Sequence, residues 1–332
     1  MLSVFVASTN TTPTTIATNV LEQAAGLQVQ AVDSADPVER EFRKVLAEDD
    51  AAQEEVDKWI RDNQAFVEQG GGLPREEMNR RIEERFATVR KSYELFLGQH
   101  ADHARGYIAY GSFLNDIGEE EAAVRQWEKA LKLDPKNPAI WNNLANYYGH
   151  RSPVKKAFEY YAKAIELNPY ESVYYHNFGT TVYLFRKDAK EYFNITEQEV
   201  FDKALGLYDK AQKLDPQNFP LATDIAQTYY GIRPMRTEAA LQAWTNALNT
   251  ARDEIEREGI YLHFARIKLN AGLFTDAQMH LDAVTNGIYG DLKRRLLRNL
   301  EAKQKSLSDT NKAAGLETTN VLEEQSSPGL VR

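Results

Sequence analysis

The chain has 332 residues, of which 42% are hydrophobic and 27% charged, a composition typical of a soluble, folded protein. Its 40 basic and 49 acidic residues give a net charge of −9 without a dense basic tract, which argues against a nucleic-acid partner. The absence of cysteine excludes disulfides, thiolate metal sites and thiol nucleophiles, and no stretch approaches the roughly 20 apolar residues of an integral membrane segment.

The amino-terminal segment, residues 1–36, leaves two interpretations open. Leu2 to Ala7 form a short apolar run, but the first basic residue is Arg40, so the basic start of a secretory signal is missing. Residues 1–36 are therefore expected to be disordered, or to be the remnant of a signal with Ala7 and Ser8 near its cleavage point. The first interpretation implies a cytoplasmic protein and the second a periplasmic or exported one.

From Pro37 onward the pattern becomes helical. Asp36 before Pro37 has the form of a helix cap followed by Pro in the first turn. Apolar positions predict a charged helix over 49–69, ended by the glycines at 70–72, and a further helix over 75–98. Residues 37–103 are expected to form an amino-terminal helical cap.

A regular period organises the rest of the chain. Tyr107, Trp141 and Tyr175 recur at every 34th position, and Pro135 and Pro169 have the same spacing. A period of this length predicts a solenoid of antiparallel helix pairs, in which each pair buries its apolar face against the next.

The cap already keeps the register of this period. Tyr93 lies one full period before Trp127, and Val89 lies one full period before Ala123. Residues 75–103 are therefore predicted to be a half-repeat.

Five repeats are predicted after the cap, over 104–137, 138–171, 172–218, 219–257 and 258–288. The third is longer than the period, because Pro216 follows Pro169 at a greater spacing than Pro169 follows Pro135. The additional residues form an insertion at 183–196, after which Thr196 and Glu199 have the spacing of a capping box. An amphipathic helix over 289–306 is expected to close the array, followed by a disordered tail over 307–332.

The recurring residues resemble the tetratricopeptide repeat (TPR). The second repeat follows the order of that family in Trp141, Leu144, Ala145, Tyr148, Ala157, Tyr161, Ala164 and Pro169. The fourth repeat departs from it, with Ala222 in the place of the first aromatic residue. The resemblance implies an all-α, right-handed superhelical solenoid without catalytic residues, cofactor or metal, which binds a protein or peptide partner in its concave groove.

The resemblance also implies which side chains line the groove, because the first helix of each pair faces it. Side-chain amides among them present a donor and an acceptor together, which suits the backbone of an extended peptide. Capture of a terminal carboxylate is not expected, because Ile108, Val173 and Asn177 stand at the clamp positions and only Asn143 matches. The implied groove residues are Arg105, Ser112, Asn115, Asn142, Asn146, His176, Thr180, Tyr183, Thr223, Gln227, Tyr230 and Arg266.

The insertion carries four aromatic residues in what is expected to be a loop between helices. They either pack on the neighbouring repeat or form an exposed contact patch. The four are Tyr183, Phe185, Tyr192 and Phe193.

Other motifs predict no chemistry. His100 and His103 have no thiolate or evident carboxylate partner for a metal, so ordinary exposed histidines are expected. Asn194-Ile195-Thr196 matches a glycosylation acceptor and is interpreted as part of a helix cap.

Two functions follow from these expectations. The first is a non-catalytic scaffold that binds an extended segment in the polar groove. The alternative is a structural or assembly subunit of a cell-envelope or secretion complex, which docks through its convex face and its ends.

Overall fold

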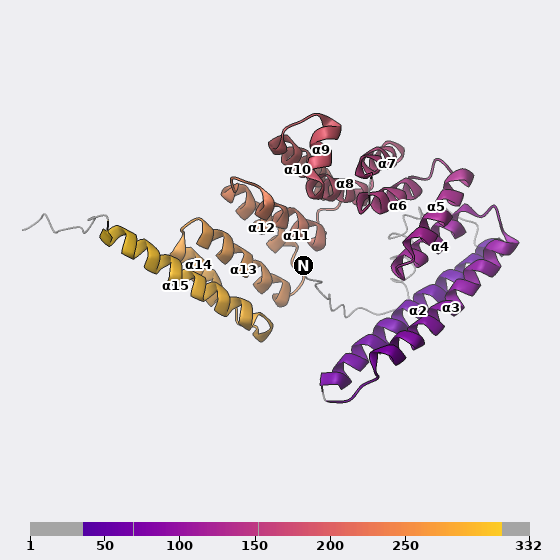
Figure 1. The fold of residues 1–332 in the computed structure, drawn as a ribbon, viewed down its shortest axis with the longest axis horizontal. Helices are drawn as coiled ribbons and strands as arrows, with labels where there is room; N and C mark the ends of the chain where they lie inside the picture. Colours follow the sequence, from indigo (N-terminus) through magenta and orange to yellow (C-terminus); the bar gives the residue numbers. More distant parts are fainter. Residues whose placement is uncertain (1–35, 69, 152, 314–332) are drawn as a thin grey trace, which may run out of the picture. The chain divides into compact units, whose positions relative to one another are not determined.

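The computed structural model describes residues 36–68, 70–151 and 153–313, without the side chains of residue 68 and residues 311–313. Two compact units divide the chain, Met1–Leu207 (unit 1) and Tyr208–Arg332 (unit 2). All regular elements in the described part of the chain are helices, so the expected all-α solenoid of helix pairs is confirmed within each unit (Figure 1). The expectations for 1–35 and 314–332 lie outside the described residues.

Unit 1 begins with a long helical hairpin of α2 (Pro37–Glu68) and α3 (Arg75–Gln99), which lie side by side in Figure 1. Asp36 accepts a hydrogen bond from the Val38 backbone N–H at 2.9 Å, as a helix cap should. At the far end, the Asn63 side-chain oxygen accepts from the Leu73 N–H at 2.6 Å and fixes the glycine turn. One uninterrupted helix therefore spans the charged sequence from residue 37 to residue 68.

A carboxyl–phenol pair lies between the two helices of the hairpin. Asp49 is only 2% exposed, and the Tyr93 hydroxyl donates to its Oδ2 at 2.8 Å. Burial raises the pKa of Asp49 to about 6, although hydrogen bonds from Tyr93 and Gln53 act in the opposite direction. The hairpin thus holds a carboxyl group that binds its proton more tightly than an exposed one.

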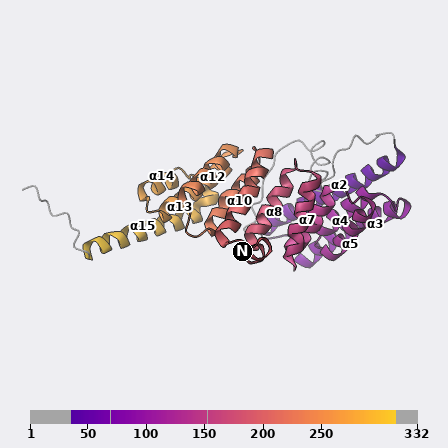
Figure 2. The same cartoon turned by 90° about the horizontal axis from the view of Figure 1, so that it is seen from above.

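The repeats of unit 1 are helix pairs stacked in chain order (Figure 2). Contacts join α4 to α5 and α6 to α7, and successive pairs meet through α5–α6 and α7–α8 contacts. Two hydrophobic clusters run through this stack, one from the hairpin to α6 and one from α6 to α10. The pairs are α4 (Ala104–Asp116) with α5 (Glu120–Leu133), α6 (Pro138–Gly149) with α7 (Val154–Leu167), and α8 (Ser172–Leu184) with α10 (Glu197–Leu214).

The small residues of the period allow the two helices of a pair to cross closely. A side chain added at Gly111 would overlap the indole nitrogen of Trp127. That nitrogen donates to the Ile108 carbonyl at 3.2 Å, so the ring of α5 lies directly on the backbone of α4. In the next pair Ala145 and Ala157 are fully buried.

The insertion of the third repeat is a helix rather than the expected loop. After α8, a short helix α9 (Arg186–Phe193) forms and ends at Asn194, which has a left-handed backbone with φ 53°. The capping box is confirmed, because the Thr196 N–H donates to Glu199 at 2.8 Å and the Glu199 N–H donates to the Thr196 hydroxyl oxygen at 3.3 Å. The apolar residues of the insertion explain the helix, since they have the neighbouring repeat to pack on.

Unit 2 continues the pairing and closes with α15 (Gly290–Ala313), which extends past the expected end at residue 306. Its preceding loop is fixed by Glu258, which is 3% exposed. The Glu258 carboxylate accepts from the Thr285 and Asn286 N–H groups at 3.0 and 2.7 Å. The other elements are α11 (Phe219–Thr228), the 3-10 turn η1 (Tyr229–Gly231), α12 (Thr237–Thr250), α13 (Glu254–Asn270), α14 (Phe274–Asp282) and the 3-10 turn η2 (Gly287–Tyr289).

We predict opposite effects of adding one methyl group at two glycines of unit 1. Gly111→Ala should lower the free energy of unfolding by about 1–3 kcal/mol, because the methyl group displaces Trp127. Gly206→Ala, in open space on α10, should raise it by up to about 1 kcal/mol, because alanine favours the helix. Denaturant unfolding of both variants checks this, and equal midpoints would contradict the close crossing.

We predict that Asp49→Asn removes a pH dependence of stability. The pKa of Asp49 is raised on folding from 3.8 to about 6, so its favourable contribution is complete below about pH 4 and is lost as the pH rises through 6. The variant should therefore be more stable than the parent at pH 7, by up to about 3 kcal/mol, and equal to it near pH 4. Thermal unfolding across this range measures the difference; parallel curves would show that Asp49 does not titrate in the hairpin.

Candidate functional site

The predicted groove residues of unit 1 come from the first helices of its pairs, α4, α6 and α8. At the α4 end, Arg105 is engaged within the fold through its Nη1, while its Nε is buried without a hydrogen-bond partner among the described residues. Its Nη1 lies 3.0 Å from both carboxylate oxygens of Glu39 on α2, which is almost fully buried. Arg105 thus fastens the hairpin to the first repeat.

Asn142 on α6 and Asn177 on α8 form a direct amide pair. The Asn177 Nδ2 donates to the Asn142 Oδ1 at 3.2 Å, and Asn142 is only 5% exposed. One turn further along α6, the Asn146 Oδ1 accepts from the Tyr161 hydroxyl at 2.7 Å. The predicted amides therefore lie together, but their acceptor oxygens already serve neighbouring helices.

Asn143 has a buried donor without a partner. It is 6% exposed, and its Nδ2 makes no hydrogen bond within the described part of the chain. The period explains this, because Asn177 lies one period after Asn143, and Asn142 lies one period after Ile108. Asn143 thus repeats the position of the Asn177 donor, but an isoleucine occupies the position of its acceptor. A buried donor left unpaired costs about 1–3 kcal/mol.

The other predicted positions on α4 and α8 differ in exposure. The Ser112 hydroxyl bonds back to the Ile108 carbonyl at 3.2 Å, whereas Asn115 is exposed at the end of α4. On α8, His176 and Thr180 are half-buried and already take part in interactions. Polar side chains thus follow the face of three successive first helices.

The predicted residues of unit 2 form a separate group on α11, η1 and α13. The Tyr230 hydroxyl lies 3.0 Å from His263 Nδ1, and the Arg266 guanidinium lies 4.7 Å from the centre of the Tyr230 ring. Gln227 is exposed, and the Thr223 hydroxyl donates to the backbone carbonyl of Pro220 at 2.8 Å. Only Gln227 and Arg266 among them present largely exposed side chains.

The His263 ring is held neutral. Burial first, and then the charge of Arg266, lower its pKa to about 4. Its ring stacks on that of Trp244 with centroids 3.8 Å apart, so the imidazole is part of the core of unit 2. A neutral ring can accept a hydrogen bond from Tyr230, whose own pKa is raised by burial.

The aromatic residues of the insertion mainly pack on the neighbouring repeat. Phe185, Phe193 and Tyr183 are half-buried against the second cluster of unit 1. Tyr192 is 38% exposed, but its ring still lies 5.3 Å from that of Phe158 on α7. Of the two interpretations left open by the sequence, the packed arrangement is the one observed.

The two histidines before α4 are engaged separately. His100 Nε2 lies 2.9 Å from a carboxylate oxygen of Glu41, a partner that the sequence did not reveal, and His103 Nδ1 accepts from the Gly106 N–H at 2.9 Å. Between residues 36 and 313, as far as the structure describes them, no three His, Cys, Asp or Glu side chains gather as a metal site. Nor is any described helix long and apolar enough to cross a membrane.

The sequence did not reveal the partners of the predicted residues. Glu39 and His263 were not predicted, since each lies on a helix other than that of the residue it contacts. In the sequence, Asn143 stands out only as the one residue that matches the carboxylate clamp. The register of the repeat, applied to residue pairs instead of single positions, is the signal that could have identified its missing acceptor.

Family comparisons agree with this geometry. Two models match, one described as TPR repeat over residues 111–149 and one as tetratricopeptide repeat over 138–171. Together with the stacked helix pairs, they show tetratricopeptide repeats over residues 111–171. Proteins built from this repeat are scaffolds for protein–protein interaction in general.

The curated relatives share parts of the sequence. Regulator of microtubule dynamics protein 1 of Homo sapiens is 31% identical over 85 residues, which cover 23% of this chain and 27% of the relative. Photosystem I assembly protein Ycf3 of Rippkaea orientalis is 27% identical over 154 residues, 44% of this chain and 89% of the relative. The chain thus spans about a quarter of the length of the first relative and 11% of that of another, a TPR repeat-containing protein of Methanocaldococcus jannaschii.

Solved structures resemble the chain more loosely. The pilF structure of Pseudomonas aeruginosa is 16% identical with a TM-score of 0.48, covering 77% of this chain and 99% of that one. YrrB, described as a TPR protein with an unusual peptide-binding site, is 16% identical with a TM-score of 0.46, covering 65% and 99%.

Proposed function

We propose that the chain is a non-catalytic scaffold that binds an extended segment of a protein partner along α4, α6 and α8 of unit 1. The observation that supports this most directly is the unpaired Nδ2 of Asn143, buried beside a helix face that also carries Asn142 and Asn146. A peptide carbonyl supplies the acceptor that Ile108 does not, and so removes the penalty of the unpaired donor.

The other amides suit the same kind of ligand. The acceptor oxygens of Asn142 and Asn146 are engaged with Asn177 and Tyr161, which leaves their NH₂ groups as donors. Several amide donors along one helix face match the carbonyl groups of an extended backbone. In such a backbone, neighbouring residues point in alternate directions. The segment is thus recognised through its main chain.

A protein segment fits the charges of unit 1 better than a nucleic acid. Arg105, the cation among the predicted face residues of this unit, is paired with Glu39. The net charge of −9 for the whole chain also disfavours the phosphate contacts that dominate nucleic-acid affinity.

Docking through the amino-terminal end is a second candidate. At the turn of the α2–α3 hairpin Phe66, Val67 and Leu73 are 61%, 54% and 39% exposed. Exposed apolar side chains on a fixed turn favour a contact with another subunit, as in the assembly-subunit alternative.

We predict that Asn143→Leu separates binding from stability. Leucine has a similar size and no donor, so the melting temperature should stay equal or rise. Affinity for a partner captured by cross-linking to the full chain should fall about tenfold, as expected for one lost hydrogen bond. Titration calorimetry with the purified partner measures the affinity.

Two variants control this experiment. Asn299→Leu makes the same exchange at an exposed position of α15 and should leave affinity unchanged. Phe66→Ser removes apolar area at the hairpin turn. Loss of affinity in Phe66→Ser with full affinity in Asn143→Leu would contradict binding along α6 and favour docking through the end.

A further inference from the structure

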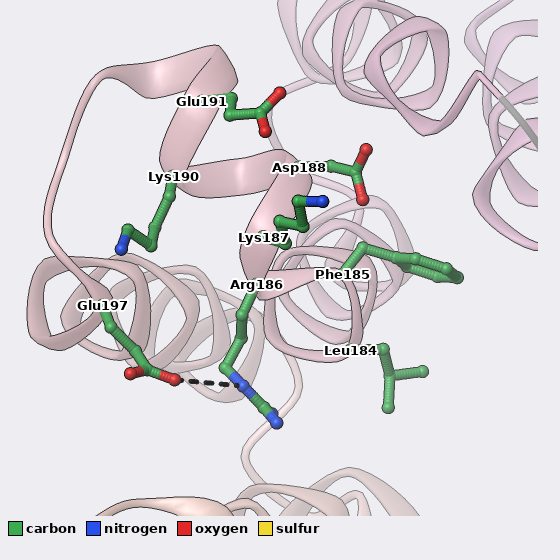
Figure 3. Close-up of a pocket in the computed structure, with 8 residues that line it drawn as sticks. All are labelled: Leu184, Phe185, Arg186, Lys187, Asp188, Lys190, Glu191 and Glu197. Atoms are coloured by element: carbon green, nitrogen blue, oxygen red, sulfur yellow. Dashed lines mark ion pairs between the residues drawn. The ribbon is translucent and has the colours of Figure 1, made fainter.

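The insertion creates a depression at the surface of unit 1, where α8 ends and α9 and α10 begin (Figure 3). Its volume is about 670 Å³, and it is a shallow concavity open to solvent. It exists because α9 folds as a helix beside α8 instead of running on as a loop. The α9 depression is lined by Leu184, Phe185, Arg186, Lys187, Asp188, Lys190, Glu191 and Glu197.

The apolar part of the α9 depression lies at its α8 edge. Leu184, the last residue of α8, is 54% exposed, a large value for a leucine that lines a concavity. Phe185 follows it and is half-buried against the second cluster of unit 1, which keeps this edge rigid. Covering Leu184 with an apolar side chain removes exposed hydrocarbon from water, so one such side chain is the natural occupant.

The α9 depression is lined by three basic and three acidic residues, but both glutamates are engaged in ion pairs. Glu197 lies 3.7 Å from Arg186, and Glu191 lies 3.2 Å from Lys155 of α7, so both carboxylates are paired. Lys187 and Lys190 are exposed.

Neither lysine has an ion-pair partner among the described residues, and the remaining acid, Asp188, lies in the first turn of α9, where it favours the positive end of the helix dipole. Within the described part of the chain, two lysines without an ion pair thus line the depression, against one carboxylate without one.

We propose that the α9 depression binds an apolar side chain of a protein segment that carries an acidic residue next to it. Leu184 contacts the apolar side chain, and Lys187 and Lys190 attract the neighbouring carboxylate. The inference rests on the proposed function, since Leu184 belongs to α8, one of the three helices of the proposed binding face. The α9 depression adds a preference for particular side chains to the main-chain recognition along that face.

A membrane surface fits the same residues less well. Stable attachment to lipid requires a long acyl chain together with a basic cluster, or an amphipathic helix with a wide apolar face. The α9 depression offers one exposed leucine and two unpaired lysines in a concave setting, which suits a single side chain.

The test uses the full chain with methyl-labelled leucines and three short host peptides of Gly, Ser and Asn. The peptides differ only in a central pair, Leu-Glu, Leu-Lys or Ser-Glu. Titrations are followed at the Leu184 methyl signals, assigned by their absence in Leu184→Ile. We expect Leu-Glu to bind about tenfold more tightly than either of the others. Equal dissociation constants for the three peptides would overturn the proposal.

Reversing the charge of the two lysines gives a result that a loss of folding cannot imitate, because the expected change is an inverted preference. In the double variant Lys187→Glu and Lys190→Glu the preference should invert, so that Leu-Lys binds more tightly than Leu-Glu. The matched control, Lys132→Glu with Lys136→Glu, changes the net charge equally at positions elsewhere in unit 1 and should keep the original order. An unchanged order in the first variant overturns the proposal.

Two further arms separate the remaining explanations. Binding to sedimented phosphatidylserine vesicles that the Lys187/Lys190 exchange abolishes, without discrimination among the peptides, would assign the α9 depression to lipid. Asn143→Leu should leave the Leu-Glu titration unchanged. If Asn143→Leu lowers the affinity for the captured partner but the three peptides bind equally, only the proposal for the α9 depression fails. If the peptides are discriminated but Asn143→Leu leaves the affinity for the partner unchanged, only the helix-face proposal fails.

Discussion

The close crossing of α4 with α5 and of α6 with α7 is the contact on which the repeats of unit 1 depend. At Gly111 the indole of Trp127 occupies the space of a missing side chain and bonds to the backbone of the facing helix. Buried Ala145 and Ala157 serve the next pair in the same way. Small residues let the two backbones of a pair approach closely. The outward-facing side chains of the pair can then pack against the neighbouring pair. The stack of these two repeats then follows from repetition of this one contact.

The polar residues of the first helices become a candidate site only through this stacking. Asn142 and Asn177 belong to successive repeats, and their hydrogen bond links α6 to α8. The same geometry one repeat earlier offers Asn143 an isoleucine instead of an amide. A repeat protein thus acquires a distinctive surface where adjacent repeats differ at equivalent positions. A side chain that bonds across repeats elsewhere has no partner there, so its donor is left for a ligand.

The departures from the period have comparable consequences. The additional residues of the third repeat form α9, whose aromatic side chains pack on α7 while its charged residues border a depression. Glu258 fixes the loop before α15, and its pKa shows how: burial opposes ionisation, but donors from Asn286 and Thr285 and the charge of Lys293 lower the pKa overall. Asp49 is shifted the other way by burial. The two units therefore carry buried carboxyl groups with opposite responses to acid.

The sequence by itself determined the helices, their pairing and the boundaries of the first repeats, because these depend on local spacing and on small and aromatic residues that recur with a constant period. It also predicted a candidate face, since a position in the period sets the side of a helix. Only the tertiary structure decided which polar groups are already engaged. Arg105 is bound by Glu39, and Tyr230 meets His263, in each case from a helix distant in the sequence. Such partners, and the helix in the insertion, depend on which surfaces the packed repeats bring together, and no local pattern contains that information.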